Sequence, residues 1–381
     1  MIRMQASTRL QLIADDLTGA LDTAAPFAGA TGPIPVYWTE APQSLPATGI
    51  ALDSGTREAG RDQARATLAR LVAGLPRASD ALPYAKLDSL LRGHAGAEIA
   101  AWLQVLAPAH CIIAPAFPAQ GRVTRDSVQL ARTADGWRPV GADLHADLRR
   151  EGLAVQHRRP GDPVPPGISL WDAETDADLA AIAAAGRALE APVLWCGSGG
   201  LAGALAGTSR PSARHPAVPA APRPVLGLFG TDHPATAEQL AACRPLVTAL
   251  RPGEDGSAAR VAGRMNEQGI ALATVSLPDR LTRGEAARRI GDELGALARR
   301  IDPPGTLLVA GGETLRALCT ALEAERLDLD GHLLPGVPRS TLRGGRFDGV
   351  RVISKSGAFG DPGLLRRLLG LERADLQGAQ A

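Results

Sequence analysis

Short apolar runs alternate along the chain with longer stretches in which Ala, Leu and Arg recur at helical spacing. This alternation is typical of repeated strand and helix units around a mainly parallel sheet. The first part of the chain predicts strands over 10–14, 34–38, 49–53, 82–88, 110–117, 167–172 and 192–196. The pattern restarts later, with strands over 225–229, 306–310 and 350–354 and helices near 235–242 and 284–300. We therefore predict an α/β protein.

A proline-rich segment separates the two series of units. Residues 208–224 hold little that could form a core, which is typical of a linker. At roughly 150 residues per domain, the length of 381 residues also favours two domains. The prediction is a domain over 1–207, a linker over 208–224 and a second domain over 225–381. Each domain would be a mainly parallel sheet flanked by helices, with the active site in the cleft between them.

Composition limits the possible partners and location. Forty-one Lys and Arg against forty acidic residues leave a formal charge of +1, which gives no overall field for holding nucleic acid or an anionic membrane. No apolar stretch approaches the roughly 18 residues that span a bilayer, and no signal-peptide core is found at the start. The four cysteines form no CxxC pair and are interpreted as buried thiols, neither a disulfide framework nor a zinc site. We expect a cytoplasmic protein.

The strand over 10–14 ends in two adjacent carboxylates, Asp15 and Asp16, which precede the start of a helix. In an open α/β sheet, ligands bind beyond the carboxyl ends of the strands. Asp16 by itself could serve only as the cap of the helix at Thr18. Two neighbouring acids after so apolar a strand favour a functional role instead.

Further polar residues follow the ends of other predicted strands in the first domain. A guanidinium group holds a carboxylate well, and aspartates accept hydrogen bonds from sugar hydroxyls. Any one of these arginines could be an ordinary surface residue, but their shared placement favours a site for a small hydroxylated acid. The set comprises Asp15, Asp16, Arg57, Lys86, Asp88, Ser89, Arg92, Arg122 and Ser198.

Two glycine-bearing turns in the second domain suit phosphate. Gly311-Gly312-Glu313-Thr314 joins a strand to a helix, whose first amides can bind an anion, although such a turn can also be purely conformational. After the strand over 350–354, residues 355–361 supply Lys355, a hydroxyl, two glycines and Asp361. Lys355 alone could be a solvated surface lysine. Pro335-Gly336, between the two turns, favours a tight turn.

A substrate half and a phosphate half together suggest a kinase. Phosphoryl transfer requires positioning, neutralisation of charge with Mg²⁺ and a carboxylate that accepts the hydroxyl proton. The chain lacks the GxxxxGK[ST] motif and the HRD and DFG motifs, so it is neither a P-loop enzyme nor a protein kinase.

Seven segments, in order along nearly the whole chain, resemble the four-carbon acid sugar kinase family: 13–20, 86–93, 114–122, 197–202, 311–314, 335–338 and 355–361. The resemblance implies an amino-terminal acid-sugar domain and a carboxy-terminal nucleotide domain. It implies that ATP phosphorylates the terminal hydroxyl of D-threonate, D-erythronate or a 3-oxo-tetronate, and the form of residues 86–93 favours the first two acids. It also implies that Gly311 to Thr314 and the region of Gly357 contact the nucleotide.

Two segments depart from the family pattern. A Ser-Gly-Ser-like turn is usual at the start of the second domain, before a Thr-x-x-Gln helix start, whereas this chain has Gly230-Thr231-Asp232-His233. Thr231 keeps a hydroxyl, but Asp232 would bring negative charge beside phosphates. The stretch after Arg122 lacks an expected glycine. These departures bear on substrate choice and on ATP affinity.

The hypothesis is therefore an ATP- and Mg²⁺-dependent kinase of a short sugar acid, with no metal site built by the protein alone and with a homodimer as one option. Asp16 is the candidate proton acceptor and Asp361 its rival. The substrate contacts would be Asp15, Arg57, Lys86, Asp88, Ser89, Arg92 and Arg122. The nucleotide contacts would be Thr231, Gly311, Gly312, Glu313, Thr314, Lys355 and Gly357.

Two alternatives come from other classes. One is a non-catalytic sensor of a sugar acid or nucleotide, which would bind without releasing ADP. The other is a phosphatase with Asp15 or Asp16 as nucleophile, but such enzymes need an Asp-x-Asp step and here the acids are adjacent.

Overall fold

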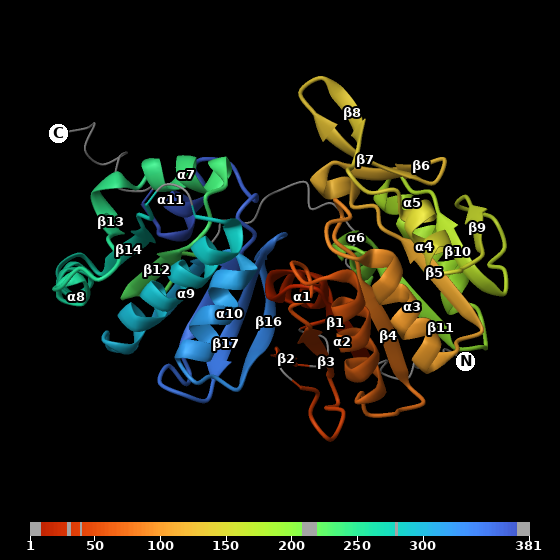
Figure 1. Cartoon of the computed structure of the whole chain (residues 1–381), viewed down its shortest axis with the longest axis horizontal. Helices are drawn as coiled ribbons and strands as arrows, with labels where there is room; N and C mark the ends of the chain where they lie inside the picture. The colour runs from red at the N-terminus through yellow and green to blue at the C-terminus, as the bar shows by residue number, and fades with distance from the viewer. Residues whose placement is uncertain (1–8, 29–31, 39, 208–218, 279–280, 372–381) are drawn as a thin grey trace. The chain divides into compact units, whose positions relative to one another are not determined.

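The computed structural model describes residues 9–28, 32–38, 40–207, 219–278 and 281–371 (Figure 1). The chain divides into two compact units, Met1–Pro211 and Ser212–Ala381. Of the predicted linker over 208–224, residues 208–218 lie outside the described residues, and 219–224 contain no helix or strand.

The first unit is built on a parallel sheet with the strand order β2-β3-β1-β4-β11-β5-β10-β9. Its central strands are almost wholly buried, as expected when helices cover both faces of a parallel sheet. The strands are β1 (Arg9–Ala14), β2 (Ile34–Tyr37), β3 (Gly49–Asp53), β4 (Ala81–Lys86), β5 (His110–Ala114), β9 (Val155–Arg158), β10 (Gly167–Trp171) and β11 (Val193–Gly197).

The helices of this unit form two series. The first comprises α2 (Arg61–Ala73), α3 (Ala95–Leu106) and α4 (Leu144–Arg150), and the second α1 (Leu17–Ala24), α6 (Gly199–Ala206) and α5 (Asp176–Arg187), each helix packing on the next. The connection from β1 to β2 runs in the opposite direction along the sheet to the connection from β4 to β5. Since such crossovers are right-handed, the two series cover opposite faces. Two 3₁₀ turns, η1 (Ala25–Phe27) and η2 (Pro118–Gln120), complete the unit.

A small antiparallel sheet of β6 (Arg122–Arg125), β7 (Val128–Thr133) and β8 (Gly136–Pro139) belongs to the first unit and was not predicted. Figure 1 shows the β7–β8 hairpin projecting from the body of the unit. Asp126 and Ser127 form the β6–β7 turn with φ angles of 49° and 67°. The carboxylate of Asp172 accepts hydrogen bonds from both backbone amides of this turn, at 2.9 Å each, which stabilises the left-handed conformation.

The second unit has the strand order β13-β14-β12-β15-β18-β17-β16. Its strands are β12 (Val225–Phe229), β13 (Val247–Leu250), β14 (Ile270–Val275), β15 (Thr306–Ala310), β16 (Arg326–Leu334), β17 (Val337–Arg343) and β18 (Arg351–Lys355). Strands β13, β14, β12, β15 and β18 are parallel to one another. Strand β17 pairs antiparallel with β18 on one side and with β16 on the other. The helical elements are α7 (Pro234–Ala241), η3 (Arg244–Leu246), α8 (Ser257–Gln268), α9 (Arg283–Arg299), α10 (Gly312–Ala321) and α11 (Leu364–Leu368).

Local sequence explains where several of these helices begin. Thr282 and Glu285 form a capping box at α9, and Thr175 and Asp178 form another at α5. Helix α9 packs on α10, and α7 packs on α11.

The predicted fold class of two mainly parallel α/β sheets flanked by helices is confirmed. The predicted strands 49–53, 225–229 and 306–310 match β3, β12 and β15, and Pro335-Gly336 forms the turn between β16 and β17. The strand predicted over 110–117 ends early, at Ala114, before Pro115, which has no backbone N–H to donate to a neighbouring strand. All four cysteines are buried free thiols, as expected.

Candidate active site

The first candidate site lies where the connections of the parallel sheet change direction. Strands β1 and β4 are neighbours, yet the chain leaves β1 through α1 toward β2 and leaves β4 through α3 toward β5. Such a topological switch point is where open α/β sheets bind ligands. Asp15 and Asp16 follow β1, and Lys86 is the last residue of β4.

Asp15 is the centre of a buried ion-pair network. Its side chain is 3% exposed, and Arg57 donates to it from Nε and Nη2 at 2.7 Å each. Lys86 Nζ donates to Asp15 Oδ1 at 3.2 Å. Burial alone would raise the pKa of Asp15, but the charges of Lys86 and Arg57 outweigh burial and hold that pKa well below its ordinary value. Asp15 is therefore an anion at neutral pH.

The carboxylate of Asp16 both caps a helix and binds Arg57. It caps α1, since Oδ1 accepts from the amide of Gly19 at 2.9 Å and Oδ2 accepts from Thr18 Oγ1 at 2.9 Å. The same carboxylate lies 2.8 Å from Arg57 Nη1. The cap considered as an alternative is thus real, but it leaves Asp16 beside the charged network. A Cβ on Gly19 would collide with Asp16 and Lys86.

Asp88 and Arg92 extend the network along the loop after β4. Asp88 is buried and accepts a hydrogen bond from Arg92 Nε. Burial would raise the pKa of Asp88, but Lys86 and Arg92 hold it below its ordinary value. The Arg92 side chain is 51% exposed, so much of its guanidinium surface faces solvent.

The remaining predicted residues of this unit lie on the neighbouring turns. Arg122 begins β6 and donates from Nη1 to Gln120 Oε1 at 2.8 Å. The carbonyl oxygen of Ser89 accepts from Gln129 Nε2 at 2.9 Å, which ties this loop to β7. Ser198 caps α6 and donates to the carbonyl of Ala116 at 2.7 Å. Ser198 is thus engaged with the backbone.

The second candidate site lies at the corresponding point of the other sheet. Strands β12 and β15 are neighbours, and the chain leaves them in opposite directions, through α7 and α10. Thr231 follows β12, and Gly311 and Gly312 follow β15. Gly311 has a φ angle of 103° and precedes α10, which has no side-chain cap. The first amides of α10 therefore suit an anion.

The turns that follow β12, β15 and β18 lie against one another at this point. A Cβ on Gly230 would collide with Thr314 Oγ1, and one on Gly357 would collide with Thr231 Oγ1. The turn after β18 therefore packs directly on the turn after β12. Glu313 and Asp232 are exposed at the same edge of the sheet.

Lys355 lies beneath the loop that it begins. Its side chain is 1% exposed, so the alternative of a solvated surface lysine is wrong. Lys355 Nζ donates to Thr236 Oγ1 at 2.8 Å and to the carbonyls of Ser356 and Phe359 at 3.1 and 3.2 Å. Burial lowers the pKa of Lys355 to about 8. Its ammonium group organises the loop from within.

Sequence reasoning did not select Thr236 and Gln239, which hold the same loop. Thr236 Oγ1 donates to the carbonyl of Gly357 at 2.7 Å, and Gln239 Nε2 donates to the carbonyls of Phe359 and Asp361 at 3.0 Å each. Both side chains are buried. The feature of the sequence that could have indicated these two residues is their three-residue spacing, which places both polar side chains on one face of α7.

Asp361 is an exposed residue at the start of α11. Its carboxylate accepts hydrogen bonds from Arg367 and from the amide of Gly363, the latter at 2.9 Å. The bond from Arg367 lowers the pKa of Asp361 below its ordinary value. Like Asp16, Asp361 therefore has a carboxylate that already accepts hydrogen bonds.

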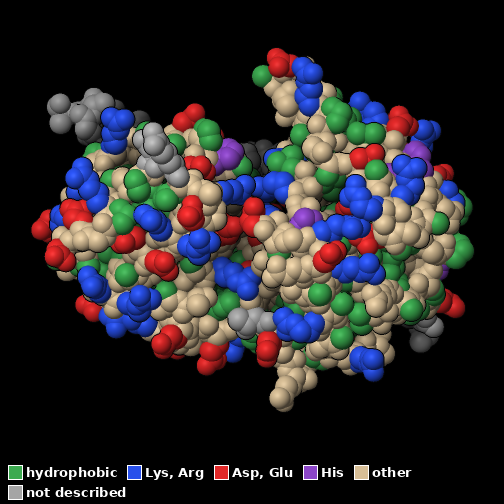
Figure 2. Space-filling model, in the orientation of Figure 1, with side chains coloured by type: hydrophobic (Ala, Val, Ile, Leu, Met, Phe, Trp, Pro, Cys, Tyr) green, Lys and Arg blue, Asp and Glu red, His purple; other side chains and the backbone are tan. Residues whose placement is uncertain are grey.

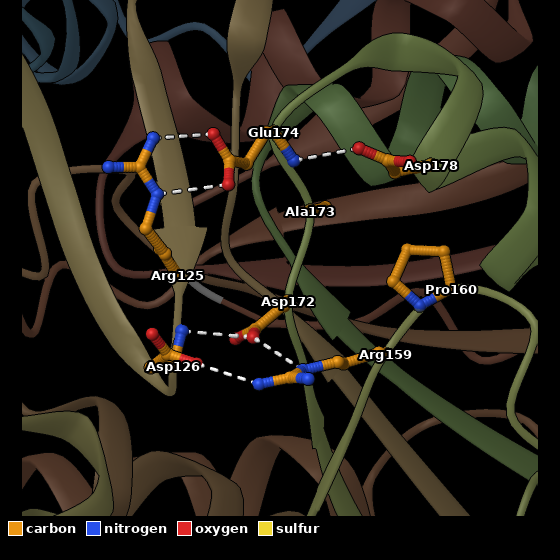
Figure 3. Close-up of a pocket in the computed structure, with 8 residues that line it drawn as sticks. All are labelled: Arg125, Asp126, Arg159, Pro160, Asp172, Ala173, Glu174 and Asp178. Atoms are coloured by element: carbon orange, nitrogen blue, oxygen red, sulfur yellow. Dashed lines mark hydrogen bonds and ion pairs between the residues drawn. The ribbon is translucent and has the colours of Figure 1, made fainter.

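A separate cavity of about 460 Å³ lies in the first unit, beyond the ends of β9 and β10 (Figure 3). Its charged side chains bind each other or the backbone: Arg125 binds Glu174, Arg159 binds Asp126, and Asp178 accepts from the amide of Glu174. Figure 3 shows Arg125 at the end of β6 paired with Glu174 after β10, and Asp126 in the β6–β7 turn paired with Arg159 after β9. The charged residues around this cavity therefore attach the small sheet to the rest of the first unit.

Among the described residues, no group of three or more His, Cys, Asp or Glu side chains could hold a metal ion. Basic and acidic side chains are intermixed on the visible surface of each unit (Figure 2), in keeping with the net charge of +1. Within the part of the chain that the structure describes, no helix has the length and apolar character needed to cross a membrane.

Comparison with protein families supports a different chemistry for each unit. Residues 10–144 match the model of a sugar-binding N-terminal domain, and residues 226–365 match that of a nucleotide-binding C-terminal domain. These ranges contain the first and the second candidate site, respectively.

Comparison with individual proteins covers nearly the whole chain. It is 33% identical to the D-threonate kinase of Cupriavidus necator and 31% identical to that of Bordetella bronchiseptica, covering 93% of this chain and 95% of each relative. It is 26% identical to the D-erythronate kinase of Heliobacterium modesticaldum, covering 92% of this chain and 94% of the relative.

Solved structures show the same fold. A Haemophilus influenzae protein of the DUF1537 family matches with a TM-score of 0.67 at 18% identity, covering 94% of this chain and 99% of that one. A Salmonella typhimurium LT2 protein matches with a TM-score of 0.71 at 18% identity, covering 96% and 99%. At this identity the likeness concerns the fold alone.

Proposed function

Because this chain belongs to the four-carbon acid sugar kinase family, we propose that it transfers the terminal phosphoryl group of ATP to the terminal hydroxyl of a four-carbon sugar acid. The observation that carries this proposal is that each parallel sheet places a different chemistry at its switch point. The first unit gathers carboxylates with guanidinium and ammonium groups, and the second gathers glycine turns with the start of a helix.

D-Threonate or D-erythronate is the proposed substrate, since the relatives matched over most of their length carry these names. A 3-oxo-tetronate is the other option, because a 3-oxo-tetronate kinase of Pseudomonas fluorescens is 31% identical over 62% of this chain and 55% of the relative.

The charges of the first unit suggest how the acid would be held. Arg57 already binds the carboxylates of Asp15 and Asp16, and Lys86 lies beside the same two carboxylates. Arg92 is half exposed, and Arg122 donates to the neutral amide of Gln120, so we assign the substrate carboxylate to these two residues. Asp15 and Asp88 would accept hydrogen bonds from the substrate hydroxyls, and Ser89 would accept or donate one. Arg57 and Lys86 hold Asp15 in place and add positive charge.

Asp16 is the proposed acceptor of the hydroxyl proton. Its position at the end of β1 and the start of α1 is fixed by the cap bonds to Thr18 and Gly19. Asp361 is the second candidate, because it lies in the range that matches the nucleotide-binding model, whereas Asp16 lies in the range that matches the sugar-binding model. In phosphoryl transfer the protein contributes mainly orientation and charge stabilisation, so a fixed carboxylate suits this role.

The turns of the second unit fit nucleotide phosphates. The uncapped start of α10 and the crowded approach of Gly357 to Thr231 leave backbone amides without covering side chains. We assign nucleotide contacts to Thr231, Gly311, Gly312, Glu313, Thr314 and Gly357, with Lys355 supporting the loop of Gly357. Mg²⁺ would enter as part of the MgATP substrate, since this ion usually binds through phosphates and one or two carboxylates.

A panel assay tests the proposal. ADP release from MgATP would be measured with D-threonate, D-erythronate, L-threonate, L-erythronate and enzymatically generated 3-oxo-tetronates, with Lys355→Ala as the control. We expect strong turnover on one acid and its loss in the variant. Nucleotide-induced thermal stabilisation without ADP release on any acid would instead favour the sensor.

The cytoplasmic location and the homodimer remain predictions of the same hypothesis. Light scattering of the purified full chain measures the second: a mass near twice the 39.4 kDa of one chain is expected, and a single-chain mass would contradict it.

A further inference from the structure

Glu98 is a buried carboxyl group that has no role in the proposed mechanism. It lies in the first turn of α3 and is 6% exposed. Its Oε1 lies 2.8 Å from Thr56 Oγ1, and Thr56 is also buried. Thr56 immediately precedes Arg57, the residue that binds Asp15 at two points.

Three short oxygen contacts follow one another from Glu98. Glu98 Oε1 is 2.8 Å from Thr56 Oγ1, Thr56 Oγ1 is 2.8 Å from Ser54 Oγ, and Ser54 Oγ is 2.9 Å from the carbonyl oxygen of Ala14. Each hydroxyl has one proton to donate, and the carbonyl has none. The two hydroxyls therefore supply protons for only two of the three contacts.

A protonated Glu98 supplies the missing one. Glu98 would then donate to Thr56, Thr56 to Ser54, and Ser54 to Ala14. With an ionised Glu98, one short oxygen–oxygen contact would lack a proton. The count of protons thus favours a neutral carboxylic acid at this position.

The series connects α3 to the end of β1. Ala14 is the last residue of β1 and precedes Asp15. The backbone amide of Arg57 also donates to the carbonyl of Asp15, at 3.3 Å. The hydroxyls of Ser54 and Thr56 therefore fix both ends of the segment that presents Arg57 to Asp15.

The charges around Glu98 agree with a neutral acid. Burial and the nearby Asp15 raise the pKa of Glu98 to about 8, against the opposing charges of Lys86 and Arg57. From α4, Asp147 accepts from the amide of Gly96 at 2.7 Å, and from α2, Arg65 reaches Gln104 at 3.4 Å. His94, which precedes α3, binds the carbonyl of Ala59 at 2.6 Å.

We propose that Glu98 is a positioning residue that works as a neutral acid, and that its proton begins the hydrogen-bond series through Thr56 and Ser54 that holds Arg57 against Asp15. Ionisation of Glu98 leaves the series one proton short and adds a negative charge beside Asp15. Alkaline pH then weakens the binding of an anionic substrate. This consequence rests on the proposed function, in which the first unit binds a sugar acid.

The test compares the wild type with Glu98→Gln, Glu98→Leu and the matched control Glu190→Gln, which changes an exposed residue of the same unit. The Gln amide keeps a hydrogen-bond donor but cannot ionise, whereas Leu has neither a donor nor an ionisable group. The KM for the acid would be measured at saturating MgATP between about pH 7 and about pH 9. We expect it to rise about tenfold in the wild type and Glu190→Gln, as one ionisation near pH 8 dictates. We expect no such rise in Glu98→Gln, and a raised KM at every pH in Glu98→Leu.

A wild-type KM that is flat over this range, or an equal rise in Glu98→Gln, overturns the proposal. A second measurement does not need catalysis: the unfolding midpoints of the wild type and Glu98→Gln as a function of pH. A carboxyl with a pKa of about 8 in the fold and an ordinary value of 4.5 makes the wild type lose stability relative to Glu98→Gln as the pH rises between these values.

The two measurements separate the two proposals. A Glu98-dependent slope in stability with no turnover on any acid supports the neutral Glu98 and rejects the kinase. Turnover together with parallel stability curves rejects the inference about Glu98 and leaves the kinase standing.

Discussion

Arg57 and Asp15 form a two-point ion pair in which Nε and Nη2 of the guanidinium each lie 2.7 Å from a carboxylate oxygen. Forty-two positions separate the two residues in the sequence, and both side chains are largely removed from solvent. The pair joins the loop after β3 to the end of β1 at the switch point of the sheet. Its strength therefore affects both the stability of the first unit and the shape of the candidate site.

Replacement of Arg57 by Ala should strongly destabilise the fold. Loss of one partner from a buried ion pair leaves an unpaired charge and typically costs about 3–5 kcal/mol. The half-exposed Arg92 is the matched comparison, and Arg92→Ala should cost less than about 1 kcal/mol while raising the KM for the acid. Denaturant unfolding of both variants measures the difference. Equal losses of stability would show that Arg57 has no special structural role.

Asp16→Asn should reduce kcat by roughly 10²–10⁴-fold, because it removes a proton acceptor. Asn is also a good helix cap, so α1 and its bond to Gly19 should persist. The affinity for nucleotide, measured by calorimetry, should not change.

Asp361→Asn is the comparison for this prediction, since Asp361 is the rival base. We expect it to lower kcat less than tenfold, because Asp361 lies in the range that matches the nucleotide-binding model and not in the sugar-binding one. Near-normal turnover in Asp16→Asn with a large loss in Asp361→Asn would reverse the assignment.

The buried Lys355 should give the second unit a characteristic pH dependence. Its pKa is about 8 in the fold against an ordinary value of 10.5, so between these values the unfolded chain binds more protons than the folded one. Stability that depends on Lys355 therefore rises with pH across this window. The difference in unfolding midpoint between the wild type and Lys355→Met should grow in favour of the wild type from about pH 8 to about pH 10. Parallel curves would show that burial does not lower the pKa of Lys355.

Gly357→Ala should raise the KM for ATP while leaving the KM for the acid within about twofold, because the two contact sets belong to different units. The added Cβ would collide with Thr231, so the loop or the turn after β12 must move.

The control is Gly263→Ala, in the interior of α8, where an added Cβ meets no atom within 4 Å. It should stabilise the fold by roughly 0.5–1 kcal/mol without changing either KM. Steady-state kinetics with each substrate varied in turn measure both effects. An unchanged KM for ATP in Gly357→Ala would remove the loop from the nucleotide site.

Local sequence was sufficient where a strand is an uninterrupted apolar run. β3, β12 and β15 carry such runs, and the structure has them at the predicted bounds. The search for apolar runs missed β16 and β17, whose buried and partly exposed positions alternate. Alternation with a period of two is typical of antiparallel strands and was present in Leu327-Asp328-Leu329-Asp330. The sequence does not predict the small sheet, because β8 is wholly exposed and β7 has a single buried position, so neither carries an apolar run.

The residues at the strand ends could also be selected from the sequence, but their relationships could not. Asp15, Lys86 and Arg57 were chosen as separate contacts for a substrate, whereas the structure binds them to one another. Lys355 was placed near phosphates, and the structure shows its ammonium group turned into its own loop. Glu98 was not noticed at all, because a glutamate in the first turn of a helix is usually explained by the helix dipole.

Most elements and the chemical groups at their ends can be predicted from nearby residues, because apolar runs, glycine turns and capping residues act within a few positions of the chain. Which strands are neighbours, and so where the two switch points lie, depends instead on contacts between distant segments. The tertiary structure also decides which charge neutralises which, since Lys86 and Asp15 are 71 positions apart. Burial removes water from these groups, and the resulting electrostatics, including the proton on Glu98, depend on contacts between distant segments that no local pattern records.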